Sequence, residues 1–443
     1  MSVLTAVRPR RFRPQGAEFG GTPGVWWLSP LALIGLVALP TTWLALAIPD
    51  ERYRALWGTP KSIDLHWTLW FSLGLVLFLG AAMLPGTRGV RRVANWPGLS
   101  TGDLRILERS ATVLFWLTMV GYIAYAGQAV RVGLSPTLLL TSLINQELYG
   151  LGIRDRLGTV PGLTTMTQFG LGFVVITGVL LIANGRRARY TRRLVVVVLL
   201  ALVRAFFVTE RLALLELLLP LLVLAVAGMS RSTRGARRAA FLPAVLLPVV
   251  VLVFAAFEYS RSWVFYAAQG GQSFPVFVVE RFAGYYVTAY NNGAIRLLHQ
   301  DSPGLPYDLW SAFWTAPGVG SANLFRTLTG VDADPAYTQA LEQFGNPEFN
   351  NYGGVASPFV DLGIAGGLVF YVLAGLLAGT LYRSLREGRI WGLLLYPVFV
   401  LTLLELPRYF YIGQGRATPG LLALVVVALL VNRARRRRTG AVL

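Results

Sequence analysis

The sequence contains no cysteine and only two histidines, His66 and His299, among its 443 residues. The absence of cysteine excludes disulfide bonds and thiolate chemistry. Two histidines that lie far apart in the chain are too few for a metal site built on histidine ligands. We therefore expect no bound metal and no cofactor, and any chemistry has to come from carboxylates, arginines, tyrosines and hydroxyl groups.

The motifs that bind nucleotides are also missing. The sequence has no Walker loop, no dinucleotide fingerprint and no hydrolase nucleophile elbow, which disfavours transport driven by ATP. Secondary transporters commonly show two similar halves or paired broken helices. Neither feature is visible in this chain.

Charged residues make up only 14% of the chain, whereas apolar residues make up 55% and are collected in long blocks. About 20 helical residues span a hydrocarbon core of roughly 30 Å. We therefore predict an all-α, polytopic membrane protein of about ten transmembrane helices. The first block has no small-residue cleavage site and is predicted to be an anchor. The predicted spans are Trp26–Ile48, Asp64–Leu84, Ala111–Val130, Leu163–Ala183, Arg193–Val208, Arg211–Met229, Ala240–Glu258, Ser357–Leu381, Ile390–Leu404 and Gly420–Val431.

The basic residues are unevenly distributed between the two predicted sides of the membrane. Arginine and lysine in short loops stay on the cytoplasmic side. Both tails and every second connection together hold 26 of the 40 basic residues but only 4 of the 21 acidic residues. This pattern predicts a protein of the inner (cytoplasmic) membrane with both termini in the cytoplasm. The net charge of +19 is then a topology signal with some attraction to anionic lipid, and we expect no nucleic-acid partner.

Two predicted outer connections are long, residues 131–162 and 259–356, and long loops in compact proteins are usually functional. The second loop divides the chain into residues 1–258 with seven spans, the extracytoplasmic loop 259–356, and residues 357–443 with three spans. This loop is rich in aromatic residues, which an interfacial aromatic belt would also explain. Its stretch 274–298 has an amphipathic pattern that predicts a helix lying on or dipping into the membrane surface.

Ionisable residues at membrane depth cost about 2.5 to 3.5 kcal/mol each on insertion scales, so each one requires a partner or a function. The fifth and sixth predicted spans are joined by a tight outer turn that contains Glu210 and Arg211. Arg204 and Glu216 lie about one turn below it, on opposite arms and at the same depth. They form either a structural ion pair that locks the hairpin or part of a site, and Arg211 is the better functional candidate.

Other charges lie at the outer boundaries of later spans. Glu258 ends the seventh span, and Glu280 and Arg281 open the amphipathic stretch, where snorkelling to the interface is an alternative explanation. Asp361 lies in the first turn of the predicted helix that begins at Ser357, where an acid also suits the helix dipole.

Two further arginines, Arg408 and Arg416, follow the ninth span and reach the same outer face. Arginine clusters bind phosphate groups through paired hydrogen bonds. These residues are therefore candidates for binding a phosphorylated ligand.

Three short stretches carry a family resemblance. They are Thr-Glu-Arg-Leu-Ala-Leu-Leu at 209–215, Gly-Tyr-Tyr at 284–286, and Asn-Tyr at 351–352 followed by Phe-Val-Asp-Leu-Gly-Ile-Ala-Gly at 359–366. Together they resemble the O-antigen polymerase, or oligosaccharide repeat unit polymerase, family of bacterial membrane glycosyltransferases. The resemblance implies transfer of a growing glycan from undecaprenyl pyrophosphate to a hydroxyl of a second lipid-linked repeat unit, outside the cytoplasmic membrane and without nucleotide or metal. It also implies a flippase and a chain-length regulator as partners.

The candidate residues can be assigned roles in this chemistry. A pyrophosphate leaving group needs cations where its charge develops, and the candidates are Arg211, Arg281 and Arg408, with Arg204 and Arg416. An acceptor hydroxyl needs a general base, for which the candidates in descending order are Glu280, Glu258, Asp361 and His299. The rings that we expect to stack against sugars are Tyr285, Tyr286 and Tyr352.

Three other functions remain open. An O-antigen ligase uses the same donor chemistry with a different acceptor. A metal-dependent glycosyltransferase that uses polyprenyl-phosphate sugars commonly places acids in the first outer loop, where Asp50 and Glu51 lie, although Arg52 and Arg54 would offset a cation. A glycolipid flippase or secondary transporter would explain intramembrane charges without catalysis.

Overall fold

The computed structural model describes residues 25–86, 97–144, 153–158, 160–185, 187–207, 212–268, 272–300 and 305–440. Within these ranges the chain is all-helical, with 81% helix and no β-strand. The predicted all-α class is therefore confirmed.

Eight of the described helices are long and apolar enough to cross a membrane, as expected for a polytopic membrane protein. A helix occupies each of the ten predicted spans, but α18 has only 16 residues and α9 carries four arginines, so the count of ten remains a prediction. These helices are α2 (Leu39–Ala47, continuous with α1, Pro30–Leu33), α4 (Leu65–Met83), α5 (Thr101–Arg131), α8 (Phe169–Asn184), α9 (Ala188–Phe207), α10 (Leu212–Met229), α11 (Thr233–Glu258), α17 (Ser357–Arg386), α18 (Ile390–Glu405) and α19 (Thr418–Gly440).

The remaining helices lie between these spans. They are α3 (Asp50–Trp57), α6 (Pro136–Ile144), α7 (Ile153–Leu157), α12 (Val264–Ala268), α13 (Phe274–His299), α14 (Ser311–Trp314), α15 (Leu324–Thr329), α16 (Ala333–Phe344) and the short turns η1 (Trp26–Leu28), η4 (Thr164–Gln168) and η6 (Pro347–Phe349). Helices α12 to α16 and turn η6 all belong to the predicted outer loop.

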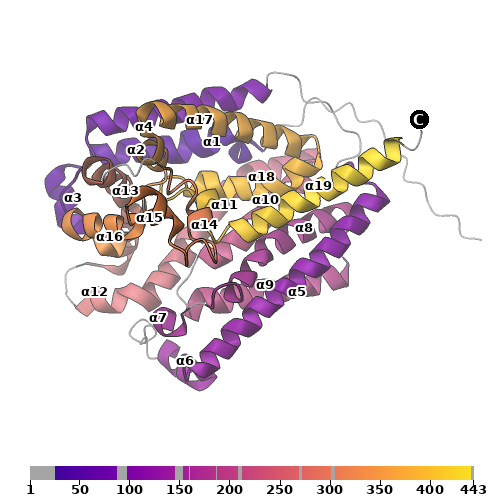
Figure 1. Cartoon of the computed structure of the whole chain (residues 1–443), viewed down its shortest axis with the longest axis horizontal. Helices are drawn as coiled ribbons and strands as arrows, with labels where there is room; N and C mark the ends of the chain where they lie inside the picture. Colours follow the sequence, from indigo (N-terminus) through magenta and orange to yellow (C-terminus); the bar gives the residue numbers. More distant parts are fainter. Residues whose placement is uncertain are drawn as a thin grey trace, which may run out of the picture.

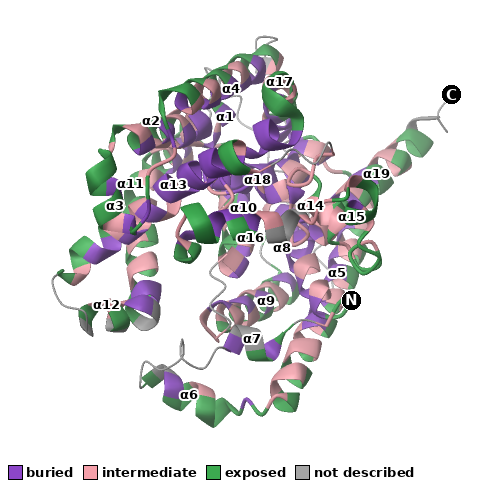
Figure 2. Ribbon diagram, turned by 60° about the vertical axis from the view of Figure 1, so that its left-hand side comes forward, coloured by how far each residue is buried: buried purple, intermediate pink, exposed green. Residues whose placement is uncertain are grey.

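The long helices form one bundle (Figure 1). Helices α4 and α17 lie along one edge and α5 lies along the opposite edge, with α18, α10 and α8 between them. Helix α18 is central, because 13 of its 16 residues are buried. Buried residues are concentrated in the middle of the molecule, around α13, α18, α10 and α8 (Figure 2). Helices α3, α13, α15 and α16 gather at one end of the bundle, and the end of α19 projects from the other.

Helix starts follow local sequence signals. The Asp64 side chain accepts a hydrogen bond from the Trp67 amide at 2.9 Å and caps α4, as the predicted start at Asp64 implies. Ser100 and Asp103 form a reciprocal capping box at the start of α5. These caps fix where the spans begin.

Glycines allow the closest pair of helices to approach. A Cβ atom added to Gly375 or Gly379 on α17 would collide with the backbone carbonyls of Phe78 and Ala82 on α4. Small residues four apart let two membrane helices pack backbone against backbone. This spacing holds α4 and α17 together along the edge seen in Figure 1.

Charges that the sequence assigns to the cytoplasmic side meet one another. Asp103 at the start of α5 pairs with Arg435 at 2.9 Å and Arg438 at 3.4 Å near the end of α19. Glu108 pairs with Arg187 at 3.7 Å. The segments predicted to share a side therefore lie at the same end of the bundle, although their cytoplasmic location remains a prediction.

The amphipathic stretch does form a helix, α13, but its expected position on the membrane surface is wrong for its second half. Every residue from Val287 to Arg296 is buried inside the protein. Tyr290 donates a hydrogen bond to the Ala38 carbonyl at 2.8 Å, because α13 packs against the first span. The polar residues of α13 between Val287 and Arg296 therefore face protein and not lipid headgroups.

Candidate functional site

A stripe of polar residues runs along α13. Arg281, Tyr285, Thr288, Asn292 and Arg296 follow one another at intervals of three or four residues, which places them on one face of the helix. The two arginines at the ends of the stripe each lie in a separate cluster of polar contacts. The candidate site is built around these clusters.

The first cluster surrounds Arg281. Its guanidinium hydrogen-bonds to Glu348 of η6 and lies 3.5 Å from the fully buried Glu258 at the end of α11. Burial would lower the pKa of Arg281, but the two carboxylates raise it above its ordinary value, so the guanidinium stays charged. Tyr266 donates a hydrogen bond to Glu348 at 2.6 Å, and burial with this carboxylate raises the pKa of Tyr266 to about 12.

A second arginine faces the same tyrosine of α13. The Arg408 guanidinium lies 5.3 Å from the centre of the Tyr285 ring, and that of Arg281 lies 5.7 Å from the same ring. Arg408 also pairs with Glu405 at 2.8 Å and contacts the Asn351 side chain at 3.4 Å. Tyr285 therefore lies between two arginines that are 127 residues apart in the sequence.

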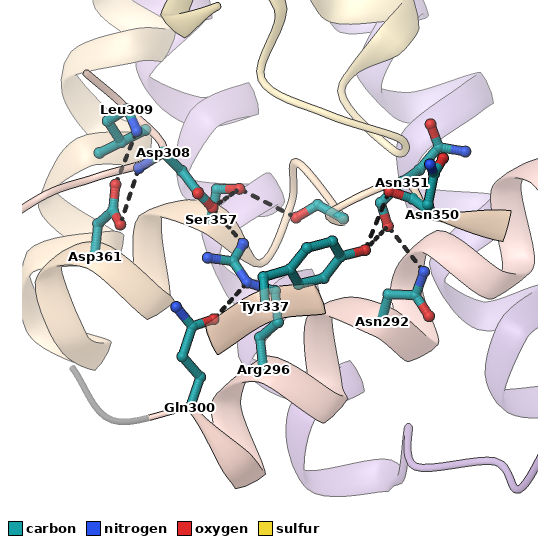
Figure 3. A network of polar contacts seen from close by, with 11 residues as sticks. Asn292, Arg296, Gln300, Asp308, Leu309, Tyr337, Asn350, Asn351, Ser357 and Asp361 are labelled. Atoms are coloured by element: carbon teal, nitrogen blue, oxygen red, sulfur yellow. Dashed lines mark hydrogen bonds and ion pairs between the residues drawn. The ribbon is translucent and has the colours of Figure 1, made fainter. Parts of the chain in front are cut away.

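The cluster at the other end of the stripe surrounds the fully buried Arg296 (Figure 3). Its guanidinium pairs with Asp308 and donates to the Gln300 side chain at 2.9 Å. Asp308 also accepts a hydrogen bond from the Ser357 hydroxyl at 2.9 Å. This cluster ties the end of α13 to the start of α17.

Asp361 holds the same loop by a different contact. Its carboxylate accepts hydrogen bonds from the backbone amides of Asp308 at 3.3 Å and Leu309 at 2.8 Å, as Figure 3 shows. The helix does begin at Ser357, as predicted, but Asp361 lies in its second turn and not in the predicted first turn. Because both oxygens of this carboxylate accept a backbone amide of the neighbouring segment, we assign Asp361 a positioning role.

The segment between η6 and α17 fits tightly between α13 and the connection from α18 to α19. Gly353 has a φ of +76°, and an added Cβ would collide with the Ala289 carbonyl of α13. A Cβ on Gly354 would collide with the backbone of Leu406 and Tyr409. Tyr352, on the same segment, packs against Tyr337 with ring centres 4.4 Å apart and is half-buried.

The other two described candidates for phosphate binding, Arg204 and Arg416, line a pocket in the other half of the bundle. Arg204, near the end of α9, and Arg416, just before α19, share this pocket with Glu216 of α10, Gln168 of η4 and Tyr122 of α5. Arg416 pairs with Glu216, and Arg204 donates to the Thr167 hydroxyl at 2.9 Å. The predicted partner of Glu216 was Arg204, but its ion pair is with Arg416, 200 residues away in the sequence.

Tyr409 lies beside Arg408 and within electrostatic range of the pocket residues Arg416 and Glu216. The Arg408 guanidinium lies 5.3 Å from the Tyr409 ring. Burial raises the pKa of Tyr409 well above its ordinary value. The carboxylates of Glu405 and Glu216 raise this pKa further, and the guanidinium groups of Arg408 and Arg416 partly offset the rise. The four described phosphate-binding candidates thus form two pairs: Arg281 and Arg408 face Tyr285, and Arg416 and Arg204 share the pocket. We call these four residues the arginine line.

The other predicted residues are placed less centrally. Glu280 is half-buried and, among the described residues, forms no ion pair. His299 is exposed, and its ring stacks on Phe344 at 3.9 Å. Tyr286 is half-buried, and burial together with Glu405 raises its pKa to about 12. Arg211 lies outside the described residues, as does the tight turn that contains it.

Three important residues, Arg296, Asp308 and Glu348, were not predicted from the sequence. The spacing of Arg296 from Arg281 and Asn292 was a usable signal, because it continues the polar stripe of α13. Asp308 and Glu348 lie in irregular segments of the outer loop, where no periodicity indicates which side chains point inward.

Metal-binding geometry is absent from the described residues, where no three His, Asp or Glu side chains are grouped closely enough to hold an ion. Asp50, which the metal-dependent alternative requires, pairs with Lys61 at 3.2 Å. The same lysine donates to the Leu46 and Ile48 carbonyls at the end of α2.

Comparison with known proteins gives no match: no family model, no curated protein and no solved structure matches this chain. Function therefore has to be argued from the residues and their geometry.

Proposed function

We propose that this protein is a membrane glycosyltransferase that polymerises oligosaccharide repeat units linked to undecaprenyl pyrophosphate, on the extracytoplasmic face of the inner membrane. The observation that supports this proposal is the line of four arginines from Arg281 to Arg204 at the predicted outer ends of the helices. Guanidinium groups bind phosphate oxygens in pairs and remain charged when buried. A pyrophosphate that enters from the membrane would meet such groups at this depth.

The proposed reaction forms one glycosidic bond. A hydroxyl oxygen of the acceptor repeat unit attacks the anomeric carbon of the donor glycan, and the bond from that carbon to the pyrophosphate oxygen breaks. Undecaprenyl pyrophosphate leaves with the bonding electrons, and the arginines stabilise the negative charge that develops on it. The hydroxyl proton passes to a carboxylate.

Glu280 is the carboxylate that we assign as this base. It lies next to Arg281 on α13 and is half-buried. Glu258 pairs with Arg281, and Asp361 accepts two backbone amides, so both of these carboxylates already have partners that hold them in place. His299 lies at the far end of α13 and is exposed.

The direct test supplies purified protein in lipid nanodiscs with undecaprenyl-pyrophosphate-linked repeat units. We expect a ladder of lengthening glycans and release of undecaprenyl pyrophosphate, both insensitive to EDTA. Transfer of the glycan only to a different acceptor would identify a ligase instead. Failure to form any glycosidic bond, with movement of the intact lipid-linked substrate across the membrane, would overturn the proposal in favour of a flippase.

Two conservative variants test the role of the arginines. Arg416→Lys keeps a positive charge near Glu216 but loses the planar fork, so we expect polymer formation to fall by about 10²- to 10³-fold, equivalent to roughly 2.7 to 4 kcal/mol. The control is Arg326→Lys, because Arg326 forms an exposed pair with Asp332 in the same outer loop. A well-folded Arg416→Lys protein with wild-type activity would remove the pocket from the phosphate site.

A further inference from the structure

Helix α11 differs from every other candidate span in how little of it is buried. Only 6% of its apolar window is buried, against 22% to 67% in the other seven. From residue 240 to residue 256, all of which the structure describes, no residue is buried. At about 1.5 Å per residue, this stretch is long enough to cross most of a bilayer core.

Both ends of α11 are nevertheless firmly attached. At the start, the Trp27 indole donates to the Ala239 carbonyl at 2.8 Å, which is the carbonyl that Pro243 cannot satisfy because proline has no amide hydrogen. At the other end, Phe257 and Glu258 are buried, and Glu258 pairs with Arg281. The exposure in the middle is therefore not a sign of a detached helix.

The exposure also extends around the helix and is not confined to one face. Val245 is 62% exposed and Leu247 is 63% exposed, although their directions differ by about 200° at 100° per residue. A helix packed along its length against a bundle has one buried stripe. Between residues 240 and 256, α11 has only half-buried positions there, among them Leu242, Leu246 and Phe254, and Leu247 beside them is 63% exposed. Apolar surface is thus uncovered on the side of α11 that faces the rest of the protein as well as on the lipid side.

The chemistry of this surface restricts what can cover it. No polar or charged residue occurs between Arg238 and Glu258. At membrane depth the occupant has to be apolar, and an extended hydrocarbon chain can run along an apolar helix of this length. Toward the candidate site, Phe254 contacts the Tyr285 ring at 5.8 Å, next to Arg281 and Arg408. The uncovered surface therefore ends at the arginine line.

We propose that the polyprenyl tail of the lipid-linked substrate lies along the middle of α11, on the side that faces the bundle, with its phosphate end at Arg281. This inference rests on the proposed function for the identity of the lipid. It adds a tail-binding surface, formed by residues 241–253, to the phosphate-binding line.

The test is photo-crosslinking in nanodiscs with a polyprenyl phosphate that carries a diazirine in its tail, compared with a phospholipid that carries the same group. We expect the polyprenyl probe to label residues 241–253 several-fold more than the phospholipid probe does, and unlabelled undecaprenyl pyrophosphate to suppress that labelling. Leu69 and Val76 of α4 are each 52% exposed and serve as the internal control, since both probes should label them equally.

Bulky variants provide an independent readout. Because Val245 and Leu247 point in nearly opposite directions, at least one of Val245→Trp and Leu247→Trp should fill the side facing the bundle and reduce polyprenyl labelling several-fold. Val76→Trp on α4 should leave it unchanged, and none of the three should alter thermal melting strongly, because all three positions are exposed.

Equal labelling of α11 by both probes would overturn the inference, since α11 would then contact only bulk lipid. Efficient disulfide crosslinking of two copies through Leu247→Cys in this cysteine-free chain would also overturn it, because a second copy would cover the surface. Failure of this inference and failure of the proposed function give different results. Glycan polymerisation with equal labelling removes the tail surface alone, whereas specific polyprenyl labelling without any glycosidic bond formation retains the tail surface and removes the polymerase.

Discussion

Three arginines of the candidate site, one buried and two half-buried, each face a carboxylate. Arg281 meets Glu258 and Glu348, Arg408 meets Glu405, and Arg416 meets Glu216. Burying a charge costs several kcal/mol unless a partner compensates for it. An arginine in an apolar setting therefore needs a carboxylate partner while no anion is bound. Glu348 keeps 35% of its side chain exposed, whereas Glu258 is fully buried, so Glu348 is the partner that a phosphate of the proposed substrate would most easily displace.

Removing one member of the buried Arg281–Glu258 pair should destabilise the protein. Arg281→Ala leaves the buried Glu258 carboxylate without this guanidinium, and we expect a loss of stability of about 3 to 5 kcal/mol. The double variant Arg281→Met with Glu258→Met replaces both charges with apolar groups and should recover much of that loss. Thermal melting in detergent measures both, and equal melting of Arg281→Ala and the wild type would contradict the buried pair.

Glu280 and Asp361, the two other carboxylate candidates for the base, should respond differently to neutralisation. Glu280→Gln should lower kcat by about 10²- to 10⁴-fold with unchanged melting, because it removes a proton acceptor. Asp361→Asn keeps the size of the side chain but weakens its hold on the Asp308 and Leu309 amides, so its main effect should be a lower melting temperature. The reverse pattern, a silent Glu280→Gln and an inactive but stable Asp361→Asn, would transfer the role of base to Asp361.

At the scale of elements, the segment from Tyr352 to Ala356 decides how closely α13 approaches the connection from α18 to α19. Gly353→Ala combines a positive φ with a collision against the Ala289 carbonyl, so we expect a destabilisation of at least about 1 to 3 kcal/mol. Gly80→Ala in α4 is the matched control, since open space surrounds Gly80 and alanine favours helix. Comparable melting temperatures for the two variants would show that the segment is not tightly packed.

The sequence predicted the elements better than their contacts. Apolar blocks and caps such as Asp64 indicate where spans begin, because these signals are local. The partner of Glu216 could not be predicted in this way, since Arg204 and Arg416 both lie at suitable depth and only the packing of α10 against α18 decides between them. The buried position of α13 was missed for the same reason: an amphipathic helix has the same pattern whether its polar face meets water or a buried polar network.

At the scale of the whole molecule, the distribution of arginine predicts the orientation of the bundle. One end of the bundle holds the ion pairs of Asp103 with Arg435 and of Glu108 with Arg187, among the arginine-rich connections. The opposite end holds helices α13 to α16 and the candidate site. The positive-inside rule assigns the arginine-rich end to the cytoplasm, which puts the candidate site on the outer face where the proposed substrate would be available.

Because the natural chain has no cysteine, single introduced thiols report this orientation without background. Ser273→Cys lies just before α13, and Ser232→Cys lies just before α11; both positions are exposed. The test uses cells whose outer membrane is permeabilised and whose inner membrane is intact. In these cells an impermeant maleimide should label Ser273→Cys and leave Ser232→Cys unlabelled until the inner membrane is disrupted. Both thiols should react fully in detergent, which controls for local burial. Labelling of Ser232→Cys alone in intact cells would invert the bundle, place the arginine line in the cytoplasm, and remove the extracytoplasmic polymerase from consideration.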